Sequence, residues 1–173
     1  MAKTRSLCLT ALFAVLLVLG AWINIPTVPP FTMQTFVLFL MLWLTTPSQM
    51  TGAVLIYIAL GLIGIPVFSG FQGGFGVILG PTGGYLVGFV VMSLMRYIPL
   101  FRRPLLAAIV GNLVVYAVSC AWYMWVYADN NEVGLLASVV ACVLPFIVPD
   151  ALKLAAAFVV SRRLPLKKWQ KTS

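Results

Sequence analysis

The chain has 173 residues, of which 62% are hydrophobic and 8% are charged, with a formal net charge of +8 and a mean hydropathy of +1.09. Soluble domains carry about 25% charged residues and disordered chains are poor in apolar ones, so this composition excludes both a water-soluble globule and a disordered chain. In the membrane protein that remains, an excess of positive charge indicates topology before it indicates nucleic-acid binding.

Apolar segments separated by proline and glycine clusters predict a single membrane domain, residues 1–173, with an all-α fold of six transmembrane helices. A spanning helix needs about 20 residues, so six helices leave short loops and tails and no room for a large extramembrane domain. The first segment ends before Pro26 without a small-residue cleavage site, and we interpret it as a retained helix rather than a signal peptide. The predicted helices cover residues 5–23, 32–46, 50–65, 85–98, 104–127 and 134–161.

The connection between the third and fourth predicted helices, residues 66–84, is rich in glycine and yet apolar. It holds seven of the chain's 14 glycines. A solvated linker would be polar, and non-helical backbone at membrane depth persists only where protein or a cavity covers it. This segment is therefore predicted to be a lid or a re-entrant loop.

The distribution of basic residues tests the number of helices, because cytoplasmic loops of membrane proteins are enriched in Lys and Arg. With six helices and both termini in the cytoplasm, ten of the 11 Lys and Arg residues fall on the cytoplasmic side, and Asp129 and Glu132 fall outside. An odd number of helices would divide the basic clusters between the two sides. The ten basic residues are Lys3, Arg5, Arg96, Arg102, Arg103, Arg162, Arg163, Lys167, Lys168 and Lys171.

Several classes of chemistry lack the residues that they need. The chain has no histidine, which argues against zinc sites and Ser–His catalysis, and its three cysteines lie in apolar segments, where buried thiols are the simplest interpretation. It has no GxxxxGK[ST] phosphate-binding loop, so it is not expected to hydrolyse ATP by that route. No metal site, cofactor or catalytic residue is predicted.

Asp150 and Lys153 are the only charged residues predicted to lie inside the hydrocarbon region of the membrane. Each costs about 2.5–3.5 kcal/mol at the centre of a membrane helix, and their spacing of three residues lets them pair on one helical face. Pro149 suits the first turn of a helix, so the helix is predicted to restart there and to present its positive end to an anion. A ligand site is favoured, with a purely structural ion pair as the alternative.

A polar stripe runs along the fifth predicted helix through Asn112, Tyr116, Ser119 and Tyr123. At 1.5 Å per residue, Asn112 lies at the depth of Lys153, and Tyr116 at that of Asp150, measured from the nearest cytoplasmic arginines. The stripe therefore predicts a pocket that opens outward, with ordinary hydrogen bonding between helices as the alternative.

Two glutamines are weaker candidates for ligand contacts. Gln34 lies at the start of the second predicted helix, and Gln72 lies in the glycine-rich loop. Either side chain fits a surface position or a hydrogen bond to a ligand beneath the lid, and the sequence leaves both interpretations open.

Motifs throughout the chain resemble the BioY family. They include Gly73-Gly74-Phe75-Gly76-Val77 and Leu79-Gly80-Pro81-Thr82-Gly83-Gly84-Tyr85-Leu86 in the loop, Gly111-Asn112 with Tyr116, and Pro149-Asp150 with Lys153. BioY proteins are the biotin-binding S components of prokaryotic energy-coupling factor (ECF) transporters. The resemblance covers about residues 5–163 and implies the six-helix S-component fold, high-affinity biotin binding and a multi-pass location in the prokaryotic cell membrane.

The resemblance also implies partners and roles for individual residues. Lys153 is the candidate for the biotin carboxylate, and Asp150 and Asn112 are candidates for the ureido group. Tyr116 and the glycine-rich loop would close over the ring, with Tyr85, Gln34 and Gln72 as further contacts. The partners would be a transmembrane coupling protein and two cytoplasmic ATPases, and Thr10 and Ala14 form the small-residue face expected to dock on the coupling protein.

Two other functions remain open from the residues alone. Asp150 and Lys153 could serve as the acid–base pair of an intramembrane enzyme, although no other titratable group is predicted within the membrane. The chain could also be a structural helix bundle without a ligand. A carrier would release its ligand chemically unchanged, whereas an enzyme would form a product.

Overall fold

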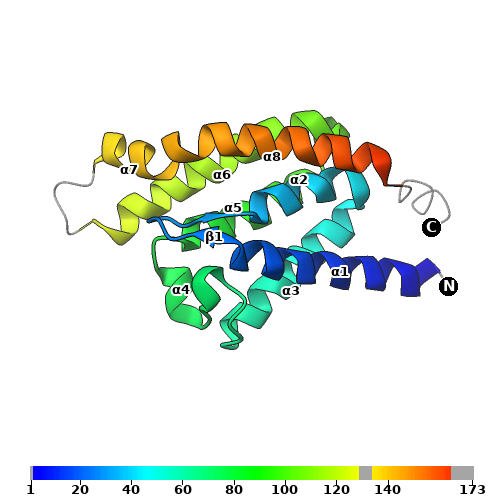
Figure 1. Cartoon of the computed structure of the whole chain (residues 1–173), viewed down its shortest axis with the longest axis horizontal. Helices are drawn as coiled ribbons and strands as arrows, with labels where there is room; N and C mark the ends of the chain where they lie inside the picture. The colour runs from blue at the N-terminus through cyan, green and yellow to red at the C-terminus, as the bar shows by residue number, and fades with distance from the viewer. Residues whose placement is uncertain (1, 129–133, 165–173) are drawn as a thin grey trace.

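The computed structural model describes residues 2–128 and 134–164, and most of these residues are helical (Figure 1). Two short strands form an antiparallel hairpin that the sequence did not predict. The elements in chain order are α1 (Ala2–Trp22), β1 (Asn24–Ile25), β2 (Phe31–Thr32), α2 (Gln34–Leu44), α3 (Pro47–Leu62), the 3-10 turn η1 (Ser69–Phe71), α4 (Phe75–Leu79), α5 (Gly83–Met95), the 3-10 turn η2 (Pro99–Arg102), α6 (Pro104–Val126), α7 (Leu135–Cys142) and α8 (Leu144–Arg163).

Three of these helical segments are long and apolar enough to cross a membrane: Lys3–Trp22, Pro104–Val126 and Leu135–Arg163. Three shorter apolar helices, α2, α3 and α5, accompany them. These segments overlap the six predicted ranges, with shifted ends, and the number of membrane-spanning helices stays a prediction. For example, α3 begins at Pro47 because Thr46 and Gln49 form a capping box that stabilises the first turn.

The last predicted helix, residues 134–161, is two helices in the structure, and the predicted restart at Pro149 is wrong. The backbone departs from helical geometry at Val143, and α8 continues through Pro149. Pro145 occupies the first turn of α8, where a missing N–H group costs little. Asp150 and Lys153 therefore lie beyond the first turn of α8, and the positive end of this helix does not form their site.

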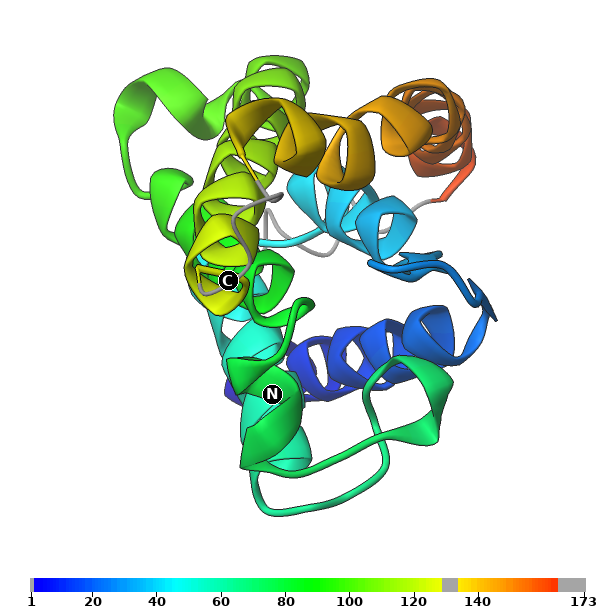
Figure 2. The same ribbon diagram turned by 90° about the vertical axis from the view of Figure 1, so that its left-hand side faces the viewer.

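The helices are arranged in a ring, in an order that differs from their order in the chain (Figure 2). Helix α2 packs between α1 and α8, α3 packs between α1 and α5, and α5 packs along α6. Glycines allow the close approach of α5 to α6, since a Cβ atom at Gly84 would lie 2.6 Å from the Trp122 Cβ atom. The predicted loop at residues 66–84 contains η1 and α4 and ends with the first turn of α5.

The described basic clusters gather at one end of the bundle, where α1 begins and α8 ends (Figure 1). Ser6 of α1 accepts a hydrogen bond from Gln49, next to the α2–α3 turn. The Arg96 guanidinium donates to the carbonyl of Thr45 at the end of α2. The predicted positions of Asp129, Glu132 and the lysines of the tail lie outside the described residues, and the two-sided topology stays a prediction.

The face of α1 predicted for docking is largely covered by the rest of the bundle. Ala14 is only 3% exposed. Thr10 is half-buried beside α3, where a Cβ atom at Gly52 would lie 3.2 Å from the Thr10 methyl group. Burial of Ala14 inside the bundle disagrees with the prediction that it contacts another protein, and for Thr10 docking stays a prediction. The exposed face of α1 carries Leu7, Leu12 and Val15 instead.

Candidate functional site

A cavity of about 380 Å³ lies between the β-hairpin, the segment 66–84 and helices α2, α5 and α8. Small-molecule sites have volumes of about 300–1,000 Å³ and apolar walls with a few placed polar groups. This cavity has that character, because Phe68, Phe89 and Phe146 line it together with a connected set of polar side chains. It lies toward the N-terminal end of α2, away from the basic clusters.

The predicted ion pair is present in the wall of this cavity. The Lys153 Nζ atom lies 3.0 Å from the Asp150 Oδ1 atom, and their side chains are 6% and 3% exposed. The residues are neighbours on one face of α8, as their spacing predicted. Their charges cancel, so the pair adds no net charge to the site.

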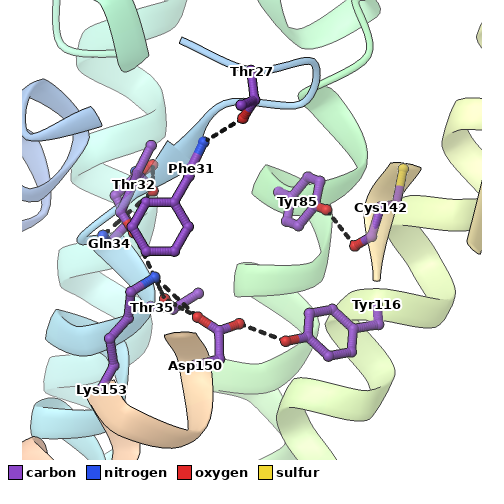
Figure 3. Close-up of polar contacts among 10 residues, drawn as sticks. All are labelled: Thr27, Phe31, Thr32, Gln34, Thr35, Tyr85, Tyr116, Cys142, Asp150 and Lys153. Atoms are coloured by element: carbon purple, nitrogen blue, oxygen red, sulfur yellow. Dashed lines mark hydrogen bonds and ion pairs between the residues drawn. The ribbon is translucent and has the colours of Figure 1, made fainter. Parts of the chain in front are cut away.

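All three N–H groups of the Lys153 ammonium have acceptors (Figure 3). Besides Asp150, it donates to the backbone carbonyl of Thr32 at 2.7 Å and to the Thr35 hydroxyl at 2.9 Å. The Nζ atom also lies 3.9 Å from the centre of the Phe31 ring, within the range of a cation–π interaction. The ammonium is therefore fixed between α8 and the start of α2.

Asp150 joins three helices that are distant in sequence (Figure 3). Its Oδ1 atom accepts a hydrogen bond from the Thr35 hydroxyl of α2 at 2.8 Å, and its Oδ2 atom accepts one from the Tyr116 hydroxyl of α6 at 2.6 Å. The predicted match in depth between Tyr116 and Asp150 thus corresponds to a direct contact. Charge-assisted hydrogen bonds of this kind are about twice as strong as neutral ones.

Three other predicted residues also line the cavity. Gln34 is buried and donates from its amide to the Tyr57 hydroxyl at 2.8 Å. The Tyr85 hydroxyl donates to the backbone carbonyl of Cys142 at 2.7 Å, which ties α5 to the end of α7. Gln72 is exposed in the loop that follows η1.

Asn112 does not line this cavity. It lies in a second cavity of about 280 Å³ between α6 and α8, which Tyr116 and Asp150 also line. Asp150 borders both cavities, whereas Tyr116 borders only the smaller one, and a hydrogen bond joins the two side chains. The structure therefore places Asn112 apart from Gln34, Gln72 and Tyr85, and does not bring the whole predicted set together.

Sequence reasoning missed Thr32, Thr35, Phe31 and Phe146. Thr35 and the Thr32 carbonyl bind Lys153 directly, while the Phe31 ring stacks on that of Phe146 with centres 6.1 Å apart. Threonines and phenylalanines are common in membrane helices, and a backbone carbonyl has no sequence signature. The one available signal was that a buried ion pair needs further hydrogen-bond partners.

The sequence profile of the BioY family matches residues 1–168 of the chain. The probable biotin transporter BioY of Pyrococcus horikoshii is 37% identical over 163 residues, which cover 94% of this chain and 97% of that protein. The biotin transporter BioY of Thermotoga maritima is 35% identical over 166 residues, which cover 92% of this chain and 95% of that protein.

A solved structure is similar throughout the fold. The crystal structure of the S-component for biotin from an ECF-type ABC transporter matches with a TM-score of 0.78 and 25% identity, over 93% of this chain and 90% of that chain. The chain therefore belongs to the BioY family, and its helical fold is that of an ECF S component. This is a family of transporter components, so the intramembrane-enzyme alternative is not retained.

Proposed function

We propose that this chain is the substrate-binding S component of an ECF transporter and that its substrate is biotin. Membership of the BioY family and the similarity to a biotin S-component support this function. The observation that carries it in this chain is the cavity of about 380 Å³, where one connected polar network meets otherwise apolar walls. Biotin combines an apolar bicyclic ring with a polar ureido group at one end and a carboxylate at the other.

Asp150 and Lys153 contact the same end of the ligand in this proposal. The ureido group and the carboxylate are separated by the ring and a flexible carbon chain, which is a longer distance than the 3.0 Å between Lys153 and Asp150. The assignment of Lys153 to the carboxylate and Asp150 to the ureido group therefore does not suit this geometry, and one end must meet both.

The ureido end suits the pair better than the carboxylate end. The pair is net neutral, and the three N–H groups of Lys153 already have acceptors, so a buried carboxylate would bring a negative charge without a free cation. The ureido group is neutral and both donates and accepts hydrogen bonds. One of its N–H groups suits the Asp150 carboxylate, and its carbonyl suits the ammonium in exchange for one of the present acceptors.

The carboxylate end then extends away from α8 toward η1 and the loop after it. Ser69 and Gln72 line the cavity there and are more open to solvent than the ion pair. Their side chains donate hydrogen bonds, while water keeps the carboxylate hydrated. Gln34 and Tyr85 line the cavity on α2 and α5, and Tyr116 acts through Asp150. Asn112, in the second cavity, supports Tyr116 rather than the ligand in this arrangement.

Titration of the purified chain with biotin, followed by isothermal calorimetry and native mass spectrometry, tests the function. We expect one biotin per chain, recovered chemically unchanged. Biotin converted to its neutral amide should bind within about tenfold of biotin if the ureido end meets the ion pair. A loss of more than a hundredfold would instead place the carboxylate at Lys153, and absence of binding by biotin itself would refute the proposed function.

The S-component fold implies partnership with an ECF module. We propose that the module consists of a transmembrane coupling protein and two cytoplasmic ATPases, because this sequence contains no phosphate-binding loop of its own. The exposed apolar face of α1, with Leu7, Leu12 and Val15, is the proposed docking surface in place of Ala14. Labelled chain should lose binding to the module when Val15 is replaced by Glu.

We further propose a multi-pass location in the prokaryotic cell membrane with both termini in the cytoplasm. The gathering of the described basic clusters at one end of the bundle supports this orientation, since positive charge is retained on the cytoplasmic side. The cavity at the opposite end would then face the outside, where biotin is captured.

A further inference from the structure

Thr35 directs its hydroxyl in an unusual way for a threonine in a helix. Several other helix hydroxyls of this chain donate to a carbonyl of their own helix, as Thr10 does to Ser6 and Ser119 does to Val115. Thr35 is the second residue of α2, so the residue four positions earlier belongs to β2 and not to the helix. Its hydroxyl donates instead to Asp150, 115 residues away in sequence.

The Thr35 hydroxyl contacts both members of the ion pair at once (Figure 3). It accepts from the Lys153 ammonium at 2.9 Å and donates to the Asp150 Oδ1 atom at 2.8 Å. Because an ammonium can only donate and an ionised carboxylate can only accept, the direction of both hydrogen bonds is fixed. The side chain is 9% exposed and lines the main cavity.

These contacts decide which part of Asp150 remains for a ligand. A carboxylate offers about four lone-pair positions. Thr35 and Lys153 occupy both positions on Oδ1, and Tyr116 occupies one on Oδ2. One acceptor position is left, on Oδ2. Without the Thr35 hydroxyl, Oδ1 would regain a free position and Lys153 would lose an acceptor.

We propose that Thr35 is a positioning residue that determines ligand recognition by saturating one oxygen of Asp150 and holding the Lys153 ammonium beside it. It leaves a single oriented acceptor for one N–H group of the ligand. This inference rests on the proposed function, because it assigns the recognised group to the ureido end of biotin.

The first test compares the biotin affinity of Thr35→Val and Thr35→Ser in the purified chain. Valine keeps the shape of threonine and removes the hydroxyl, so we expect affinity to fall about 10- to 100-fold, which is about 1.4 to 2.8 kcal/mol. Serine keeps the hydroxyl and should bind within about threefold of the wild type. Thr35→Ala serves as a second hydroxyl-free variant should the valine variant fold poorly.

Thr51→Val is a matched control. The Thr51 hydroxyl is buried in α3 and has no hydrogen-bond partner among the described residues. The same chemical change at this position should leave biotin affinity unchanged. If Thr51→Val and Thr35→Val weaken binding equally, the effect reflects membrane packing and the proposal is wrong.

A second measurement separates positioning from a general structural role. Biotin analogues methylated on either ureido nitrogen lack one N–H group each. For the analogue that has lost the N–H group meeting Asp150, Thr35→Val should cost less than threefold, because the recognised contact is already absent. Equal losses for biotin and both analogues, or a wild-type affinity for Thr35→Val, would overturn the proposal. If the wild type binds no biotin at all, the proposed function fails first and this inference falls with it.

Discussion

Replacement of Lys153 by Met removes the ammonium while keeping much of the side-chain volume. In the wild type this group donates to Thr32, Thr35 and Asp150, at 2.7, 2.9 and 3.0 Å. The variant leaves the Asp150 carboxylate, 3% exposed, with the hydroxyls of Thr35 and Tyr116 but without a counter-ion. The site changes from neutral to negative, so both folding and recognition should suffer.

The two effects have different expected sizes. Removal of one partner of a buried ion pair costs about 3–5 kcal/mol, because the remaining charge is uncompensated, and this should lower the free energy of unfolding. A hydrogen bond from a charged donor to the ligand contributes about 1.5–3 kcal/mol, and 1.4 kcal/mol is a factor of ten. The loss of Lys153 also frees Asp150 to move from its position beside the ligand. Together, the lost hydrogen bond and this movement should lower biotin affinity at least about a hundredfold.

Thermal unfolding and calorimetric titration of the same preparations measure both effects. Lys3→Met is the matched control, because Lys3 is exposed near the start of α1, and it should change neither quantity. The double variant Asp150→Asn with Lys153→Met should be more stable than the single variant, since no lone charge remains, and should still not bind. Wild-type affinity in Lys153→Met would refute the reasoning, because the ion pair would then have a structural role alone.

Two further predictions concern individual contacts, and a third concerns the topology. Tyr116→Phe removes the 2.6 Å hydrogen bond to Asp150 and should weaken biotin binding about tenfold by calorimetry, while an unchanged affinity would exclude Tyr116 from the network. Gly84→Ala should lower the free energy of unfolding by about 1–3 kcal/mol and with it the unfolding temperature. Gly76→Ala should change neither, because a Cβ atom at Gly76 would have no neighbour within 4 Å. In a variant without native cysteines, single cysteines at Asp129 and Lys171 should react with an impermeant maleimide from opposite faces of the membrane, and labelling of both from outside intact cells would contradict the predicted topology.

The sequence predicted those residues of the site whose charges are costly to bury in a membrane helix. A charge inside an apolar segment is costly, so Asp150 and Lys153 were conspicuous, and their spacing gave the pairing that the structure contains. Depth along the helix gave the contact of Tyr116 with Asp150. Asn112 satisfied the same depth argument but lies in the second cavity, because depth alone does not determine the direction in which a side chain points.

The features that could not be predicted depend on tertiary packing. Pro145 and Pro149 both suit the first turn of a helix, and only the packing of α7 and α8 places the break before Pro145. The hairpin of β1 and β2 is two residues long in each strand, too short for a periodic signal. Thr10 and Ala14 had the small side chains of a docking surface, and such residues equally suit packing within the chain, which is where Ala14 lies.

The ion pair also explains why this site is built from three helices rather than one. Buried pairs are often no more stable than apolar residues of similar volume, so Asp150 and Lys153 are weak candidates for a role in stability. Their charges are tolerated because α2 supplies the Thr35 hydroxyl and the Thr32 carbonyl lies just before it, while α6 supplies the Tyr116 hydroxyl. The network therefore forms only when α2, α6 and α8 are assembled. A polar ligand then meets donors and acceptors whose directions are already fixed, which lowers the entropic cost of binding it.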